Sequence, residues 1–171
     1  MQNYNLTATS KRCTCVNAYY DIARYVVKRY KKQFGIEPDE MKLHKLLYFL
    51  QRECIVMYNQ PLFVNQFEAG RYGPVMKCLR SSDWKAGLKG IQEVLPIVTP
   101  MGMEDYSEAV DIVFERYAGM KSWTLSNISH GESCWKKAKD KEADGHPVEI
   151  LTSDIRIDAE NIKLRRVLFP N

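Results

Sequence analysis

His130, Glu132 and Cys134 place a base, an acid and a thiol within one short segment. A paired cysteine and histidine can supply the thiolate of covalent catalysis. Closeness in sequence is not the geometry that catalysis needs, and no glycine pattern for an oxyanion hole accompanies these residues. We therefore interpret His130 as a side chain that caps a helix end or hydrogen-bonds a buried group. We predict no catalytic residues and no enzymatic activity, with an enzyme centred on His130 as an alternative.

A second charged pair, Glu68 and Arg71, lies in otherwise apolar and aromatic sequence. The two side chains could act as an acid and an electrophile, or they could form a salt bridge that fixes the turn from Gly70 to Pro74. We favour the salt bridge, because charges in apolar surroundings must be paired. Tyr72, Gly73 and Pro74 are interpreted as a turn lock, since glycine permits unusual backbone angles and proline suits the first position of a helix starting at Val75.

The five cysteines form no disulfide framework and lack the paired spacing of a zinc site. No phosphate-binding loop or cofactor fingerprint is present, so we expect neither metal nor cofactor. The net charge of +4 permits nucleic-acid binding without requiring it. The dense basic run from Lys28 to Lys32 falls at a helix end, where we do not expect base recognition, although a DNA-binding regulator remains an alternative. No membrane span or signal-peptide core is apparent, and we expect the cytoplasm.

The length of 171 residues suits one domain, which we place at 16–171 after a polar leader at 1–15. Its centre is a helix that follows a cap at Asp39 and stops after Tyr58. Apolar residues recur there at steps of three and four, and further apolar side chains cover most of the circumference, so neighbours must surround this helix. The expected core of this helix comprises Leu43, Leu46, Leu47, Tyr48 and Leu50.

The remaining elements indicate a mainly α fold, a compact helical domain with a small β-hairpin or extended element. An earlier helix ends at Gly35, and short extended pieces are expected at 62–64, 67–69 and 148–151. A weak helix follows Ser82, and another opens at Glu104 and ends at Gly119. Ser122 and Ser133 are expected to cap short helices, and a last helix spans 159–169.

Two ordered motif blocks in this chain resemble a known family. In the family, the first block reads K-L-x-K-L-L-Y-x-x-Q, then P-L-F, then E-A-W-x-Y-G-P-V, and the second reads L-S-x-x-T-H followed by P-W. This pattern resembles the Panacea domain, also called the SocA-like or GepA-like antitoxin domain. Gly70 replaces the family's tryptophan, Ser129 its threonine and Cys134 its proline. The residues that match the first block are Lys42, Leu43, Lys45, Leu46, Leu47, Tyr48, Gln51, Pro61, Leu62, Phe63, Glu68, Ala69, Tyr72, Gly73, Pro74 and Val75.

The resemblance implies an antitoxin, of a family often carried on prophages and mobile elements, that neutralises a toxin encoded nearby by direct protein–protein binding. A SocA-like relative instead delivers its toxin to a ClpXP-type protease, so a proteolytic adaptor is the alternative. The departures at Gly70 and Cys134 leave the local form of the motif surface open. The resemblance implies a partner-binding or motif surface made of Glu68, Arg71, Tyr72, Gly73, Pro74, His130 and Trp135.

Overall fold

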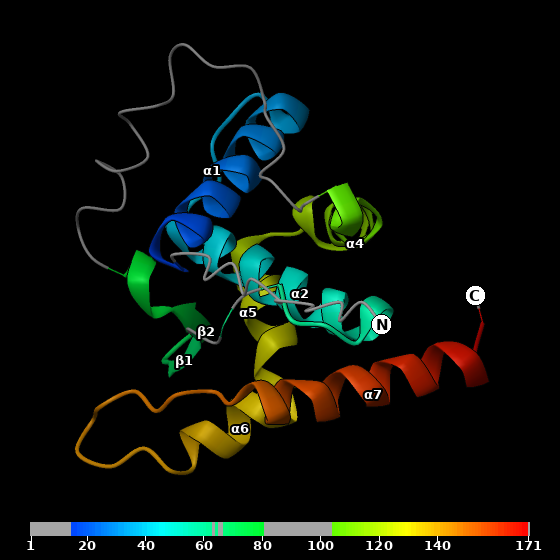
Figure 1. Cartoon of the computed structure of the whole chain (residues 1–171). Helices are drawn as coiled ribbons and strands as arrows, with labels where there is room; N and C mark the ends of the chain where they lie inside the picture. Colours follow the sequence, from blue (N-terminus) through cyan, green and yellow to red (C-terminus); the bar gives the residue numbers. More distant parts are fainter. Residues whose placement is uncertain (1–14, 63, 65–66, 81–103, 171) are drawn as a thin grey trace, which may run out of the picture.

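The computed structural model describes residues 15–62, 64, 67–80 and 104–170 (Figure 1). The expected leader at 1–14 and the weak helix after Ser82 lie outside these ranges. None of the helices in the described ranges has an apolar stretch long enough to cross a bilayer. The helices and strands are α1 (Cys15–Phe34), α2 (Glu40–Tyr58), β1 (Phe67–Gly70), β2 (Gly73–Met76), α4 (Ser107–Val113), α5 (Ser122–His130), α6 (Ser133–Lys139) and α7 (Thr152–Leu168). This confirms the mainly α class with a small hairpin.

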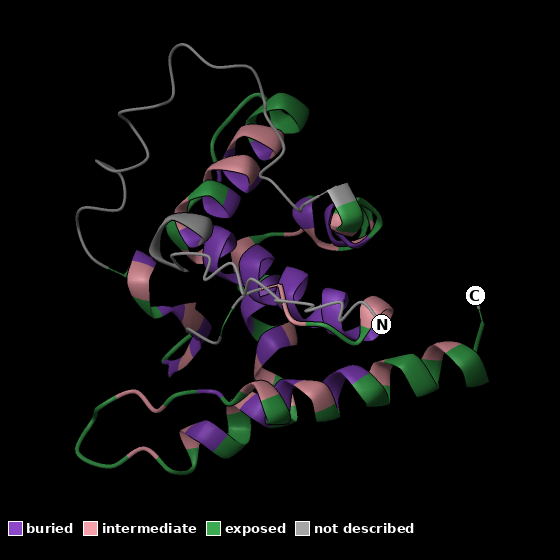
Figure 2. Cartoon of the chain, viewed as in Figure 1, coloured by how far each residue is buried: buried purple, intermediate pink, exposed green. Residues whose placement is uncertain are grey.

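Helix α2 is the centre of the molecule (Figures 1 and 2). The Asp39 carboxylate accepts the Lys42 backbone N–H at 2.8 Å and caps its start, and Asn59 ends it in the left-handed conformation. Every residue from Lys42 to Val56 is buried, because α1, α4, α5, α7 and β2 all pack around this helix. The five core residues expected from the sequence are each at most 1% exposed.

The two strands form an antiparallel hairpin, with Phe67 opposite Met76 and Gly70 opposite Gly73. The segment before α7 continues this sheet on the other edge of β1. There the Ala69 N–H donates to the Val148 carbonyl at 2.8 Å, and the Ile150 N–H donates to the Phe67 carbonyl at 2.9 Å. The expected extended pieces at 67–69 and 148–151 are therefore confirmed, whereas Leu62 and Val64 lie in bends outside any strand.

The predicted helix at Val75 is wrong. The backbone from Gly73 to Met76 is a strand, and a single 3₁₀ turn, η1 (Lys77–Leu79), follows it. Tertiary contacts decide this conformation, because β1 pairs with the segment and His44 Nδ1 on α2 accepts the Met76 N–H at 3.0 Å. A proline at an edge position of such a short sheet removes no ladder hydrogen bond.

The C-terminal half packs short helices and one long helix on α2. A 3₁₀ turn, η2 (Glu104–Tyr106), opens α4, and a π-helical segment, η3 (Phe114–Ala118), continues it to the expected end at Gly119. Ser122 and Ser133 start α5 and α6, but the cap positions are Lys121 and Glu132. Helix α7 begins at Thr152, earlier than the predicted start at 159.

Candidate functional site

Lys45 and Ser126 hold the turn that joins β1 to β2. Lys45 Nζ donates to the Pro74 carbonyl at 2.8 Å, and Ser126 Oγ donates to the Tyr72 carbonyl at 2.8 Å. Gly73 has φ +100, and a Cβ added there would lie 2.2 Å from Ser129 Oγ. The unusual backbone angle expected at Gly73 is confirmed, and no other residue fits this position without strain.

The predicted salt bridge between Glu68 and Arg71 is wrong. The Glu68 carboxylate instead lies 3.7 Å from Lys77 Nζ and 3.3 Å from an Arg80 guanidinium nitrogen. Glu68 sits within β1, whereas Arg71 follows the end of that strand in the exposed turn. Because the Glu68 carboxylate pairs with Lys77 and Arg80, the structure gives no support to the alternative in which Glu68 and Arg71 act together as an acid and an electrophile.

Arg71, Tyr72 and Trp123 form an exposed cluster at the turn, which we call the aromatic patch. The Arg71 guanidinium lies 5.3 Å from the Tyr72 ring centroid, and the Tyr72 and Trp123 rings meet edge to face with centroids 5.2 Å apart. Tyr72 is 40% exposed and Trp123 58% exposed. Trp123 is not among the residues that the sequence motifs indicate, although its position beside the buried Leu125 and Ser126 in α5 marks it as an aromatic residue off the core face.

His130 and Trp135 lie beneath the same turn and are only partly exposed. Their rings stack with centroids 4.2 Å apart, and Trp135 Nε1 donates to the Gly70 carbonyl at 3.1 Å. Burial, followed by the charge of Lys45, lowers the pKa of His130, while a hydrogen bond to the Arg71 backbone opposes this. The structure thus brings the residues of the expected motif surface together but exposes mainly Arg71 and Tyr72 among them.

The position of Gly70 shows how the chain accommodates one departure from the family pattern. A Cβ added at Gly70 would come within 3.0 Å of the Gly73 carbonyl oxygen and 3.0 Å of a Val75 methyl group. A larger side chain at this position would therefore require the hairpin to shift.

Glu132 and Cys134 belong to a buried network separate from the stacked His130. The Glu132 carboxylate forms an ion pair with Arg52 and lies 3.2 Å from the Tyr48 hydroxyl, which is also 3.1 Å from Cys134 Sγ. Burial raises the pKa of the Cys134 thiol, so the thiol stays protonated at neutral pH. This arrangement does not provide an activated nucleophile.

A backbone hydrogen bond explains the second departure from the family pattern, which is Cys134 in place of proline. Its N–H donates to Asp158 Oδ2 at 2.8 Å, a bond that proline could not make. The Ser133 N–H donates to the other oxygen of the same carboxylate at 3.0 Å. The Asp158 carboxylate on α7 thereby accepts hydrogen bonds from the first two backbone N–H groups of α6.

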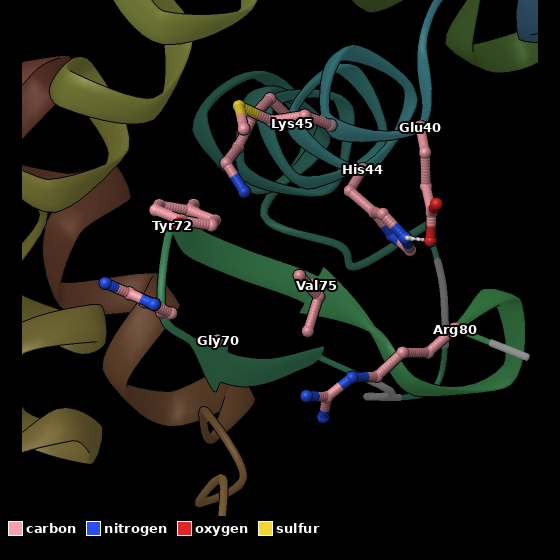
Figure 3. A pocket seen from close by; sticks show the side chains of 9 residues that line it. Glu40, His44, Lys45, Gly70, Tyr72, Val75 and Arg80 are labelled. Carbon is pink, nitrogen blue, oxygen red and sulfur yellow. Dashed lines mark ion pairs between the residues drawn. The ribbon is translucent and has the colours of Figure 1, made fainter.

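A cavity of about 350 Å³ lies between α2 and the hairpin, next to the aromatic patch (Figure 3). We call it the Lys45 pocket, because the Lys45 side chain reaches from α2 toward Tyr72 along its wall. Burial lowers the pKa of Lys45 to about 7, so its amine is about half protonated at neutral pH. The lining residues are Glu40, Met41, His44, Lys45, Gly70, Arg71, Tyr72, Val75 and Arg80.

His44 is a neutral donor in this pocket. Burial, with smaller effects from the charges of Lys45 and Arg80, lowers its pKa to about 4. Its Nδ1 accepts the Met76 N–H, so the ring proton resides on Nε2, which lies 3.7 Å from Glu40 Oε1. That contact, dashed in Figure 3, is consequently not an ion pair at neutral pH. Within the described ranges, no group of three His, Cys, Asp or Glu side chains is arranged to hold a metal ion.

Comparison with known proteins gives one family. No curated protein and no solved structure matches the chain. The family model described as "Antitoxin SocA-like, Panacea domain" matches residues 43–136, which contain most of α2, the hairpin, α5, the aromatic patch and most of the pocket lining. Because this match covers more than half of the 171 residues, the chain belongs to the SocA-like Panacea antitoxin domain family.

Proposed function

We propose that this protein is an antitoxin that neutralises a cognate toxin, encoded nearby, by direct protein–protein binding. Family membership supports the antitoxin class. The observation that favours direct binding is the aromatic patch. Trp, Tyr and Arg are the residue types most enriched among the few residues that dominate interface energy, and here all three are exposed side by side.

The turn that carries the patch is held from several sides before any partner arrives. Lys45 and Ser126 bind its carbonyl groups, and Trp135 binds the carbonyl of Gly70 beside it. A preorganised surface loses little conformational entropy when a partner binds, which favours affinity. Neutralisation by covering the active surface of a toxin needs no turnover, and it is consistent with the buried, protonated state of Cys134. We propose that residues 16–171 act in this way as one domain.

Two other functions receive less support. The basic run of α1 is partly neutralised within the molecule, since Arg29 pairs with Asp111 at 2.5 Å and Lys31 with Glu37 at 3.4 Å, and this disfavours a DNA-binding regulator. A proteolytic adaptor that delivers the toxin to a ClpXP-type protease would use the same binding step. It differs in its outcome, because the toxin would disappear from the cell rather than persist in an inert complex.

The test is co-expression with the toxic product of an adjacent gene, followed by co-purification. Trp123→Ala should weaken the complex by about 30-fold or more, corresponding to about 2 kcal/mol, and should reduce rescue of growth. The matched control is Phe169→Ala, which removes another exposed ring, 75% exposed, after the end of α7. Both variants should keep the thermal midpoint of the parent, because neither ring is buried.

Three results would contradict the proposal. The first is that no neighbouring product is toxic. The second is rescue without a detectable complex and without loss of the toxin. The third is equal affinity of the Trp123→Ala and Phe169→Ala variants, which would remove the aromatic patch from the interface.

A further inference from the structure

We propose that the Lys45 pocket binds a carboxylate group, and that in the neutralised complex the toxin supplies this group from an acidic side chain or its C-terminus. The inference rests on the proposed function. It places the carboxylate of the toxin in the pocket beside the aromatic patch.

The pocket contains a buried amine, charged when protonated, that has no anionic partner. Lys45 is 1% exposed, and its bond to the Pro74 carbonyl uses one of the three N–H groups of an ammonium. In the part of the chain that the structure describes, no carboxylate lies within 4.0 Å of Lys45 Nζ. Buried charges in proteins are normally paired, so a bound anion would provide the partner that the protonated Lys45 lacks.

The groups around Lys45 favour a single negative charge. Arg71 and Arg80 from the hairpin side are cationic and exposed, and Arg80 shares the Glu68 carboxylate with Lys77. His44 on α2 and His130 on α5 both have lowered pKa values and are neutral. Glu40 is the one acid in the lining and lies near the His44 ring at the start of α2 (Figure 3). The surroundings therefore carry a net positive potential that attracts an anion.

The walls and size of the pocket favour a carboxylate over a phosphate. Met41, Tyr72 and Val75 contribute apolar surface, where the desolvation of a doubly charged phosphate costs more than that of a monoanion. One ammonium balances one carboxylate. A volume of about 350 Å³ is near the lower end of the range for ligand pockets and accommodates an acidic side chain.

Binding should depend on pH in a defined direction. In the free protein the amine of Lys45 loses its proton as the pH rises through about 7. An anion bound next to Lys45 favours the charged amine and raises its pKa, so above pH 7 binding is coupled to the uptake of a proton. Affinity should therefore fall as pH rises. If only the protonated amine binds, the protonated fraction drops about 25-fold between pH 6.5 and pH 8.5, and the dissociation constant rises by the same factor.

The experiment measures the dissociation constant of the complex with the toxin at both pH values. The parent should show the 25-fold difference, whereas Lys45→Met should bind more weakly at pH 6.5 and lose the pH dependence. The control is Lys42→Met, a buried lysine on the same helix whose Nζ donates to the Tyr30 hydroxyl at 3.0 Å and does not line the pocket. This control should keep the pH dependence of the parent. A Lys45→Met variant that retains that dependence would overturn the proposal.

A second variant keeps the test decisive if Lys45→Met does not fold. Arg80 is exposed, and Lys77 still lies beside Glu68 when Arg80 is removed. Arg80→Met should therefore change the thermal midpoint little and weaken toxin binding several-fold at pH 6.5. Unchanged affinity in this variant would count against the pocket as the site of the acidic group.

Titration of the toxin-free protein with acetate separates a toxin carboxylate from a free one. Acetate should shift the NMR signal of the Met76 amide, which His44 binds, in a saturable way that Lys45→Met abolishes. If acetate binds but the affinity for the toxin is insensitive to Lys45→Met, the carboxylate is a free ligand and the assignment to the toxin is overturned. If no toxin complex forms, the proposed function fails, and the acetate titration alone then tests whether the Lys45 pocket binds a carboxylate. The absence of a shift in that titration overturns carboxylate binding by the pocket.

Discussion

Gly73→Ala should destabilise the protein through two separable effects. The first is backbone strain, because φ at Gly73 is +100 and residues with a Cβ pay about 1–3 kcal/mol in such conformations. The second is steric overlap, because the new Cβ would lie 2.2 Å from Ser129 Oγ and 2.9 Å from Lys45 Cε. Overpacking of a buried site typically costs about 1–3 kcal/mol. We therefore expect a loss of roughly 2–6 kcal/mol in the free energy of unfolding.

The assay is urea unfolding followed by circular dichroism, with two comparison variants. Gly35→Ala also introduces a Cβ at positive φ, +74, but nothing lies within 4 Å of it, so this control reports backbone strain alone. Ser129→Ala removes the nearer clashing atom. The cost of Gly73→Ala should therefore be smaller in the Ser129→Ala background than in the parent. The reasoning is refuted if Gly73→Ala costs no more than Gly35→Ala, or if its cost is the same in both backgrounds.

Two further predictions concern the core and the Lys45 pocket. Leu47→Ala should lower the free energy of unfolding by about 2–5 kcal/mol, because Leu47 is 0% exposed, whereas the exposed Leu164→Ala should change it little; equal thermal midpoints would contradict this. Lys45 has a folded-state pKa of about 7 against 10.5, so between these values the unfolded chain binds more protons and stability rises with pH. From pH 7 to pH 8.5 this adds roughly 2 kcal/mol to the free energy of unfolding, and Lys45→Met should abolish this gain in urea titrations at the two pH values.

Helix α2 could be recognised from the sequence because local and tertiary signals agree there: apolar periodicity, an Asp39 cap and a stop at Asn59 all indicate the same element. The signals disagree elsewhere. Pro74 has the local pattern of a helix start, but β1 and His44 draw the backbone into a strand. The apolar pattern does not indicate the early part of α7, because Asp154 and Asp158 interrupt it. These acids are buried because Lys137 binds Asp154 and the start of α6 binds Asp158.

The candidate site was predicted less well than the fold because it depends on contacts between distant segments. Glu68 and Arg71 are close in sequence, but Glu68 lies in β1 and Arg71 in the turn after it. Closeness in sequence therefore predicts the wrong partner for Glu68, whose carboxylate pairs with Arg80. Trp123 meets Tyr72 only because α5 packs against β2. The Lys45 pocket likewise requires the hairpin to lie on α2, which no local pattern indicates.

The enclosure of α2 also affects how members of this family can be recombined. The matched segment starts inside α2 and ends inside α6, yet α1 and α7 outside it cover much of the same helix. Two guanidinium nitrogens of Arg166 on α7 donate to the fully buried Glu53 carboxylate on α2 at 2.5 and 2.9 Å. A chimera that exchanges only residues 43–136 would join a foreign α2 to unmatched outer helices. We therefore expect functional chimeras between relatives to require the exchange of α1 and α7 together with the central segment.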